Sequence, residues 1–256
     1  MTAPRRTLVI VPTFDEAATI AATLEGLRVR VPDADVLVVD DGSPDGTADL
    51  VDQIAADEAS TGAARALSVL RRPGKLGLGT AYVQGFRWAL DRGYDTVVEM
   101  DADGSHRAED LPRLLARASQ AELVIGSRWV PGGRVLHWPK HREVLSRLGN
   151  LYTRVLLGLG VRDATAGFRV YDAALLRRIP LDEIASHGYG FQVDMTWRAR
   201  RAGARIIEIP IVFVERTAGV SKMSNAIIVE AMTLVTRWGV AHRVGQLLRL
   251  VRRRAT

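Results

Sequence analysis

Two aspartates separated by a single alanine are the residues of this sequence best suited to chemistry. Asp101-Ala102-Asp103 follows the apolar segment Thr96–Met100, which has the pattern of a buried strand. Two carboxylates at a strand end can turn toward one hard cation, and Mg²⁺ or Mn²⁺ prefers such oxygen ligands and often binds substrate phosphates as well. The same pattern occurs in ordinary solvated turns, so its position after a strand is what favours a metal site.

A second acidic cluster, DDGS at residues 40–43, follows the apolar segment Val36–Asp40. A carboxylate at this place is suited to accept hydrogen bonds from the base or ribose of a nucleotide, and Gly42 permits a tight turn. The alternative is a turn in which an aspartate caps the next helix. The segment KLGLGT at residues 75–80 lacks the complete phosphate-loop pattern, so we interpret it as a turn that brings backbone close to a ligand.

Four basic side chains are candidates for binding phosphate. Arg128 directly follows the apolar segment Leu123–Gly126, which favours a role in a pocket. Arg142 lies in a run rich in His, Lys and Arg, and the alternative for it is a solvated helix face. Arg216 and Lys222 bracket a loop with Gly and Ser, which is typical of a lid that closes over phosphates.

Short apolar strands alternate with helical patterns along the chain. This alternation predicts an α/β fold with a mainly parallel sheet and helices on both faces. The expected strands are Thr7–Val11, Val36–Asp40, Ala66–Leu70, Thr96–Met100, Leu123–Gly126, Phe168–Tyr171 and Ile206–Val214. The expected helices are Thr19–Arg28, Val51–Ala59, Ala81–Leu90, Val144–Leu157 and Val193–Arg201. Ligands bind beyond the carboxyl ends of such strands, where PTFDE, DDGSPDGT, RRPGKLGLGT and DADGSH all fall.

Composition sets limits on the class of protein. A chain of 256 residues with 47% hydrophobic and 25% charged residues is ordinary for a globular protein. It contains no cysteine, which excludes disulfides and thiolate metal sites. Because no repeat or linker is visible, we expect one catalytic domain at residues 1–222 and a helical appendage at residues 223–256.

The net charge of +6 comes from the C-terminal segment. Glu230 is the last acidic residue, and six arginines follow it: Arg237, Arg243, Arg249, Arg252, Arg253 and Arg254. The rest of the chain is balanced, so nucleic acid is not an expected partner. Apolar residues in the same segment recur at helical spacing, which predicts a basic amphipathic helix on a membrane surface. The alternative is a helix packed on the domain. No apolar run is long enough to span a bilayer, so we expect a cytoplasmic, peripheral protein.

Eight segments, in order along the chain, resemble family 2 glycosyltransferases of the GT-A fold. They are PTFDE, VVDDGSPDGT, KLGLGTAY, EMDADGSH, VIGSRW, VRDATAGFRVY, GYGFQVDM and ERTAGVSK, and they cover residues 7–222. The resemblance is specifically to the dolichyl- or polyprenyl-phosphate mannose synthases. It implies a single Rossmann-like domain.

The resemblance also implies roles for the matched residues. The guanosine pocket would include Pro12, Phe14, Glu16, Val39 and Asp41. Asp101 and Asp103 would hold Mg²⁺ or Mn²⁺ at the diphosphate, with Ala102 against the nucleotide. Ser105 stands where many relatives have a glutamine, and its hydroxyl would be a weaker ligand. The remaining donor and phosphate contacts would be Arg128, Arg142, Gln192, Val193, Arg216 and Lys222, with Asp103, Arg128 and Arg142 catalytic.

The implied reaction is inverting transfer of mannose from GDP-mannose to a polyprenyl phosphate at the cytoplasmic face of a membrane, with or without a membrane-anchoring partner protein. A phosphate monoester is already anionic near neutral pH because its second pKa is about 6, so the reaction needs no general base. We therefore interpret His106 as a structural or solvent-facing residue. The tryptophans Trp129, Trp138 and Trp238 are expected to pack and not to bind sugar.

Two other functions are open from the sequence. One is a polyprenyl-phosphate glucosyltransferase that uses UDP-glucose, although such relatives usually carry spanning helices. The other is a non-catalytic subunit that binds a nucleotide sugar. The acidic pair and Arg128 argue against a non-catalytic subunit.

Overall fold

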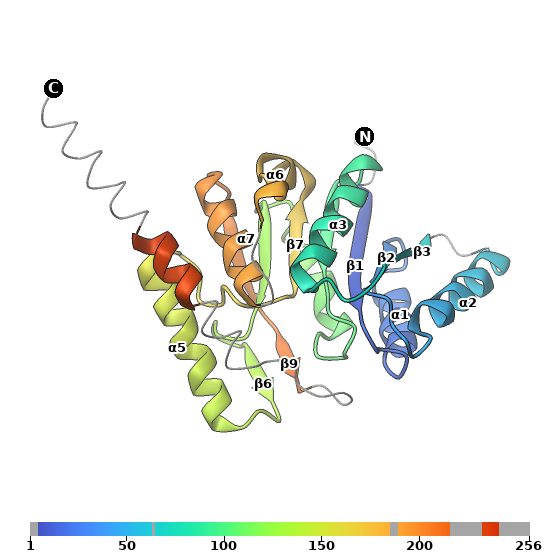
Figure 1. Ribbon diagram of the computed structural model, residues 1–256, viewed down its shortest axis with the longest axis horizontal. Helices are drawn as coiled ribbons and strands as arrows, with labels where there is room; N and C mark the ends of the chain where they lie inside the picture. The colour runs from blue at the N-terminus through green and yellow to red at the C-terminus, as the bar shows by residue number, and fades with distance from the viewer. Residues whose placement is uncertain (1–4, 63–64, 185–188, 216–231, 241–256) are drawn as a thin grey trace, which may run out of the picture.

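A computed structural model describes residues 5–62, 65–184, 189–215 and 232–240. Within them, one sheet has the strand order β3-β2-β1-β4-β7-β5-β8, and β6 and β9 form a small second sheet (Figure 1). The strands are β1 Thr7–Thr13, β2 Asp35–Asp40, β3 Leu67–Arg71, β4 Thr96–Glu99, β5 Leu123–Ser127, β6 Arg134–Leu136, β7 Arg169–Asp172, β8 Ile206–Pro210 and β9 Val212–Val214.

The longer helices are α1 Ile20–Arg30, α2 Thr47–Ser60, α3 Leu78–Asp91, α5 Lys140–Leu157 and α7 Tyr189–Arg201. Shorter pieces are η1 Ala108–Asp110, α4 Leu111–Leu115, α6 Ala173–Arg178 and η2 Leu181–Glu183. Residues 232–240 are also helical. Helices α2, α3 and α5 begin earlier than expected because their first turns are polar or glycine-rich and carry no apolar spacing.

Burial of the strands on both faces explains their apolar runs. Along β1, Leu8 and Ile10 belong to one core cluster together with residues of α3, α6 and α7. Val9 and Val11 belong to the other, with residues of α1, α2 and α4. Successive side chains of a strand point to opposite faces, so the helices cover both sides of the sheet, as expected. The mainly parallel sheet is confirmed, with β7 antiparallel to both of its neighbours.

The single strand expected at Ile206–Val214 is wrong. Pro210 closes β8, which pairs with β5, and β9 then leaves the main sheet to pair with β6. Ile211 lies between them: its N–H donates to the Ser127 carbonyl at 3.1 Å, and its own carbonyl accepts from the N–H of Arg134. The backbone of Ile211 thus bonds β5 through its N–H and β6 through its carbonyl, so one apolar run serves two sheets.

The helix at residues 232–240 packs on the domain beside α5 (Figure 1). Val235 is 2% exposed, and the rings of Trp238 and Trp197 stack with centroids 5.6 Å apart. A Cβ on Gly239 would lie 2.6 Å from Leu156 Cγ, which shows how closely the two helices approach. Val235 and Trp238 therefore pack on the domain, which is the alternative given for this segment and, for Trp238, the packing role expected from the sequence. Leu234 in the expected tail stripe is half-buried, and the other members of that stripe lie outside the described residues: Ile227, Ala231, Val244, Leu247, Leu248 and Val251.

No helix within the described part of the chain is both long enough and apolar enough to cross a bilayer.

Candidate active site

The carboxyl ends of β1, β2 and β4 meet at one edge of the sheet. Strand β1 lies between β2 and β4 and runs parallel to both. The segments that follow these strands, PTFDE, DDGS and DADGSH, therefore converge, as the sequence predicted. The loop between β3 and α3 (the β3 loop, residues 72–77) reaches the same edge, because the Lys75 ammonium lies 4.3 Å from the centre of the Phe14 ring.

Asp101 and Asp103 lie at this edge in different environments. The Asp101 side chain is 32% exposed and accepts a hydrogen bond from the Tyr82 hydroxyl at 3.2 Å. Asp103 is buried and accepts from the Ser105 N–H at 3.0 Å. Ala102 is also buried, and its carbonyl accepts from Thr23 Oγ1 at 3.1 Å, which ties the turn to α1.

Two residues that the sequence analysis did not assign to the site position Asp101. Tyr82 is fully buried against Phe191, and burial together with the Asp101 charge raises the pKa of its hydroxyl, so it remains a donor. His106 is buried and stacks on Phe168, and its Nδ1 accepts the Asp101 N–H at 3.0 Å. This contact identifies His106 as a structural residue. The spacing of Tyr82 on α3 gave no signal beyond that of an ordinary core aromatic.

Gly167 brings the distant part of the chain to the acidic pair. A Cβ there would lie 3.4 Å from His106 Cε1, 3.6 Å from Asp101 Oδ2 and 3.7 Å from Gln192 Nε2. The backbone of Gly167 therefore lies next to side chains of the DADGSH segment and of α7. Gln192 was predicted to lie near the donor, and the structure brings it to Asp101. Its neighbour Val193 is 2% exposed and belongs to the core cluster, so its side chain does not line a pocket.

Behind the acidic pair lies the buried carboxyl of Glu99, the last residue of β4. Burial raises its pKa to about 7, against the opposing effect of the Arg169 guanidinium. Arg169 is itself fully buried and donates to the carbonyls of Ala166 and Ala164. The Arg169 guanidinium thus supports the loop before β7.

The two aspartates of DDGS have different tasks. Asp40 accepts from Thr13 Oγ1 at 2.8 Å and from the N–H and hydroxyl of Ser43, so it shapes the turn. Asp41 pairs with the buried Arg72 and accepts from the N–H groups of Leu76 and Gly77 at 3.2 Å. Asp41 therefore already holds the β3 loop. A carboxylate has about four lone-pair sites, which leaves capacity for a nucleotide.

The other residues expected around guanosine lie beside this cluster. Pro12 is paired with Val39 across β1 and β2. Val39 is fully buried in the core, so only its backbone can contact a ligand. Phe14 is half-buried under Lys75, and Glu16, also half-buried, accepts from Thr19 Oγ1 at 3.0 Å.

Arg128 makes a buried ion pair that the sequence analysis missed. Its Nε and Nη2 donate to the two oxygens of Asp163 at 2.8 and 2.7 Å, and Nη2 also donates to Thr165 Oγ1. Burial alone would raise the pKa of Asp163, but the Arg128 charge and hydrogen bonds hold it below its usual value. The guanidinium also faces the rings of Trp138 and Phe213 at 5.6 and 5.4 Å.

Arg142 lies at the start of α5, half-buried, so the solvated helix face does not describe it. It forms an ion pair with Glu215 and lies 4.1 Å from the centre of the Trp138 ring. Arg128 and Arg142 therefore share one aromatic neighbour, Trp138, and lie on the same side of the sheet edge. Arg216 and Lys222, the other two basic candidates, lie outside the described residues.

The carboxylates of Asp101 and Asp103 suit a hard divalent cation whose other ligands come from substrate and water. Within the described residues, no group of three or more His, Asp or Glu side chains converges as a complete metal site. Mg²⁺ commonly takes only one or two carboxylates and completes its shell with phosphate oxygens and water, which the partly exposed Asp101 beside Asp103 allows. The backbone of Ser105 is hydrogen-bonded to Asp103, and its side chain is buried.

Comparison with known proteins decides the family. The family model described as Glycosyl transferase family 2 matches residues 8–180. The chain belongs to this family. The glycosyltransferase is 56% identical over 238 residues to an undecaprenyl-phosphate mannosyltransferase of Micrococcus luteus, with 93% of this chain and 96% of the relative covered. It is 48% identical to a polyprenol monophosphomannose synthase of Mycolicibacterium smegmatis, with 97% and 92% covered.

Solved structures confirm the GT-A fold of the glycosyltransferase. Glucosyl-3-phosphoglycerate synthase from Mycobacterium tuberculosis, in complex with Mn²⁺, uridine diphosphate and phosphoglyceric acid, superposes with a TM-score of 0.64. The match covers 91% of this chain and 79% of that chain at 20% identity. The same synthase with Mn²⁺ and UDP-glucose as well as phosphoglyceric acid gives a TM-score of 0.63. At this identity the likeness concerns the fold alone.

Proposed function

We propose that this glycosyltransferase moves mannose from GDP-mannose to the phosphate of a polyprenyl phosphate, with inversion at the anomeric carbon. The observation that carries the proposal is the 56% identity, over 93% of the chain, to an undecaprenyl-phosphate mannosyltransferase. Three features support the proposal: a carboxylate pair at the end of β4, polar segments that converge beside it, and the two arginines that share Trp138.

The acidic pair is proposed to bind the donor diphosphate through Mg²⁺ or Mn²⁺. The metal, when bound, supplies Lewis acidity that stabilises the departing GDP. Tyr82 and His106 hold Asp101 in place from two sides. Asp103 is fixed by the Ser105 N–H, so neither carboxylate must reorganise when the diphosphate arrives.

Arg128 and Arg142 are proposed to face the acceptor phosphate and offset the repulsion between two anionic substrates. A guanidinium fork matches phosphate oxygens in geometry as well as charge. Asp163 and Glu215 now pair with these arginines and hold them in place. The acceptor phosphate is its own nucleophile, and no side chain near the pair is assigned as its base. Arg216 and Lys222 are proposed to add positive charge around the phosphates.

The nucleotide is proposed to lie over Pro12, Phe14, Glu16 and Asp41, with backbone contacts from Val39 and Ala102. Gln192 approaches from the other side. Because a polyprenyl phosphate stays in a bilayer, we propose a peripheral protein at the cytoplasmic face of a membrane, held there by its own surface or by an anchoring partner protein.

One assay tests the reaction. Purified protein is incubated with labelled GDP-mannose, Mg²⁺ or Mn²⁺ and a polyprenyl phosphate, and the lipid phase is analysed for mannosyl lipid of β configuration. UDP-glucose in place of GDP-mannose tests the glucosyl alternative. Formation of glucosyl lipid but no mannosyl lipid would overturn the donor assignment. Absence of any product in a single turnover would indicate a non-catalytic subunit.

A further inference from the structure

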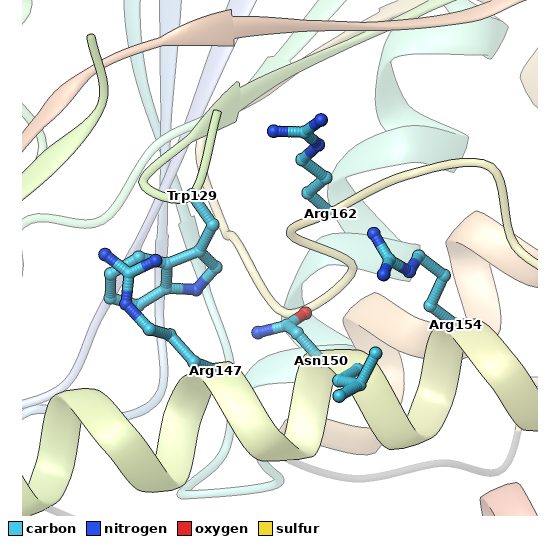
Figure 2. A pocket seen from close by; sticks show the side chains of 6 residues that line it. Trp129, Arg147, Asn150, Arg154 and Arg162 are labelled. Atoms are coloured by element: carbon cyan, nitrogen blue, oxygen red, sulfur yellow. The ribbon is translucent and has the colours of Figure 1, made fainter. Parts of the chain in front are cut away.

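A positively charged hollow lies along α5, and neither aspartate of the acidic pair lines it. It has a volume of about 350 Å³ and is lined by Trp129, Arg147, Asn150, Leu151, Arg154 and Arg162. Figure 2 shows that these side chains come from α5, from the end of β5 and from the loop that follows α5. The proposed reaction uses none of them.

The charge of the hollow is mostly uncompensated. Arg147 pairs with Glu143 at 2.8 Å and lies 4.2 Å from the centre of the Trp129 ring. Within the described part of the chain, no carboxylate comes within 4.0 Å of the Arg154 or Arg162 guanidinium. Two guanidinium groups beside one hollow favour an anionic occupant, and phosphate matches their geometry best.

Two residues that line the hollow each have a buried polar atom with no hydrogen-bond partner among the described residues. Trp129 Nε1 and Asn150 Oδ1 are buried without a hydrogen bond to any described residue. Asn150 is 3% exposed, and its Nδ2 donates to the Ser146 carbonyl and to Thr165 Oγ1, both at 3.0 Å. The Ser146 carbonyl can only accept, so this contact fixes the orientation of the amide. Buried groups left unsatisfied are rare because each costs free energy.

One of these atoms is a hydrogen-bond donor and the other an acceptor. Together they suit a phosphate ester that also carries a hydroxyl or a bound water. The indole N–H of Trp129 can donate to a phosphate oxygen beside the arginines. Asn150 Oδ1 can accept from a hydroxyl. A bare anion would satisfy the first group and leave the second unsatisfied.

An apolar stripe begins at the rim of the hollow. Val144, Leu148 and Leu151 are spaced by four and three residues on α5, so they share one face, and their exposed fractions are 55%, 57% and 45%. Leu151 also lines the hollow. An amphiphile bound by its phosphate would find apolar surface directly beside it.

We propose that the hollow binds the phosphate headgroup of an anionic bilayer phospholipid, whose acyl chains lie along the stripe of Val144, Leu148 and Leu151. The lipid is not a substrate, so this inference goes beyond the proposed reaction. It places α5 at the membrane surface. The charge complementarity of the arginines and the adjoining apolar face together select a lipid over a protein partner.

Vesicle sedimentation tests the site with the full chain. The vesicles contain phosphatidylcholine with or without phosphatidylglycerol and no prenyl phosphate. The double variant Arg154→Ala, Arg162→Ala should bind the anionic vesicles about tenfold more weakly than the unaltered protein, since each arginine near the surface contributes to attraction. The control Arg117→Ala, Arg177→Ala removes two exposed arginines from other elements and should change binding less than twofold. Leu148→Ser should weaken binding to both kinds of vesicle.

Three outcomes would overturn the proposal. An equal loss in both double variants would show that net charge, and not this hollow, attracts the vesicles. A large fall in turnover of a short, water-soluble prenyl phosphate in the Arg154, Arg162 variant would assign the hollow to the acceptor. If inorganic phosphate at fixed ionic strength displaces vesicles as well as dihexanoyl phosphatidylglycerol does, the site binds free anions. Unchanged turnover with the soluble acceptor keeps this test separate from the proposed function.

Discussion

At the residue scale, the site depends on side chains that hold other side chains. Asp41 binds Arg72 and the β3 loop, Asp163 binds Arg128, and His106 binds the backbone of Asp101. The sequence indicated Asp41, Asp101 and Arg128 as candidates, since strand ends and carboxylate spacing are local signals. It could not indicate Asp163, because its pairing with Arg128 spans 35 positions and carries no periodic pattern.

Asp103→Asn tests the acidic pair most directly. Loss of one charged ligand should lower kcat about 100-fold or more, with little change in melting temperature. The measurement is turnover over a range of Mg²⁺ and Mn²⁺ concentrations. Near-normal turnover that still requires metal would remove Asp103 from the site.

His106→Ala separates structure from base catalysis. Loss of the buried acceptor leaves the Asp101 N–H unsatisfied, which should cost about 1–3 kcal/mol of unfolding free energy. Much of the turnover should remain, and the pH dependence of kcat should keep its shape. A thousandfold loss accompanied by disappearance of one limb of the pH profile would make His106 the base.

Asp163→Asn tests the buried ion pair. The change leaves Arg128 buried without its counter-charge, which should cost about 3–5 kcal/mol in chemical unfolding. Because the pKa of Asp163 is lowered in the folded protein, the stabilisation is present above the ordinary carboxyl pKa and is lost as pH falls through the lowered value. The difference between wild type and variant should therefore shrink in acid.

The matched control is Asp172→Asn, which weakens the more exposed pair with Arg5. Its effect should stay below about 1 kcal/mol, since an asparagine can still cap α6. Equal effects of the two substitutions would show that the Arg128 pair is no more important than a surface pair.

At the element scale, the sequence predicted the strands and the long helices but not every connection. Apolar runs and their period reveal elements whose burial is regular. The division of Ile206–Val214 into β8 and β9 depends on the partners of the Ile211 backbone: its N–H donates to β5, but its carbonyl accepts from Arg134 of β6, and that is a tertiary choice. The role of residues 232–240 was equally ambiguous, because an apolar stripe fits a lipid surface and a helix-packing surface alike.

Trp238→Ala tests the packed helix. The substitution removes the stack on Trp197 beside the buried Val235, which should lower the unfolding free energy by about 2–3 kcal/mol. Arg237→Ala, on the exposed side of the same helix, is the control and should have almost no effect. Equal, small effects would show that the helix detaches without cost.

At the scale of the whole molecule, the proposed nucleotide site and the proposed acceptor site belong to different parts of one sheet. The acidic segments follow β1, β2 and β4, whereas Arg128 directly follows β5 and Arg142 lies on α5. The sequence predicted that the acidic clusters meet at the strand ends, because they follow successive strands of a parallel sheet. It gave no sign of the hollow along α5, since Trp129, Asn150 and Arg162 gather from separate segments.

Thermal unfolding with ligands tests whether diphosphate and metal bind as a unit. GDP with Mn²⁺ at about 100 times its dissociation constant should add roughly 2.7 kcal/mol of stability. For a chain of this size, that corresponds to a rise of about 5–10 °C in Tm. GDP with a chelator should give less, and Asp103→Asn should remove the difference. The same shift with and without metal would contradict shared binding.

The antiparallel strand β7 lies between β4, which the acidic pair follows, and β5, which Arg128 follows. Its hydrogen bonds therefore hold these two parts of the site together. It pairs with β4 on one side and β5 on the other, so Arg169 lies opposite both Glu99 and Ile125. Amides of such a central strand exchange with solvent only when a large cooperative unit opens. The spacing between the carboxylates and Arg128 is thus held by hydrogen bonds that should be among the slowest to exchange in the protein, and breathing at the sheet edges would leave that spacing intact.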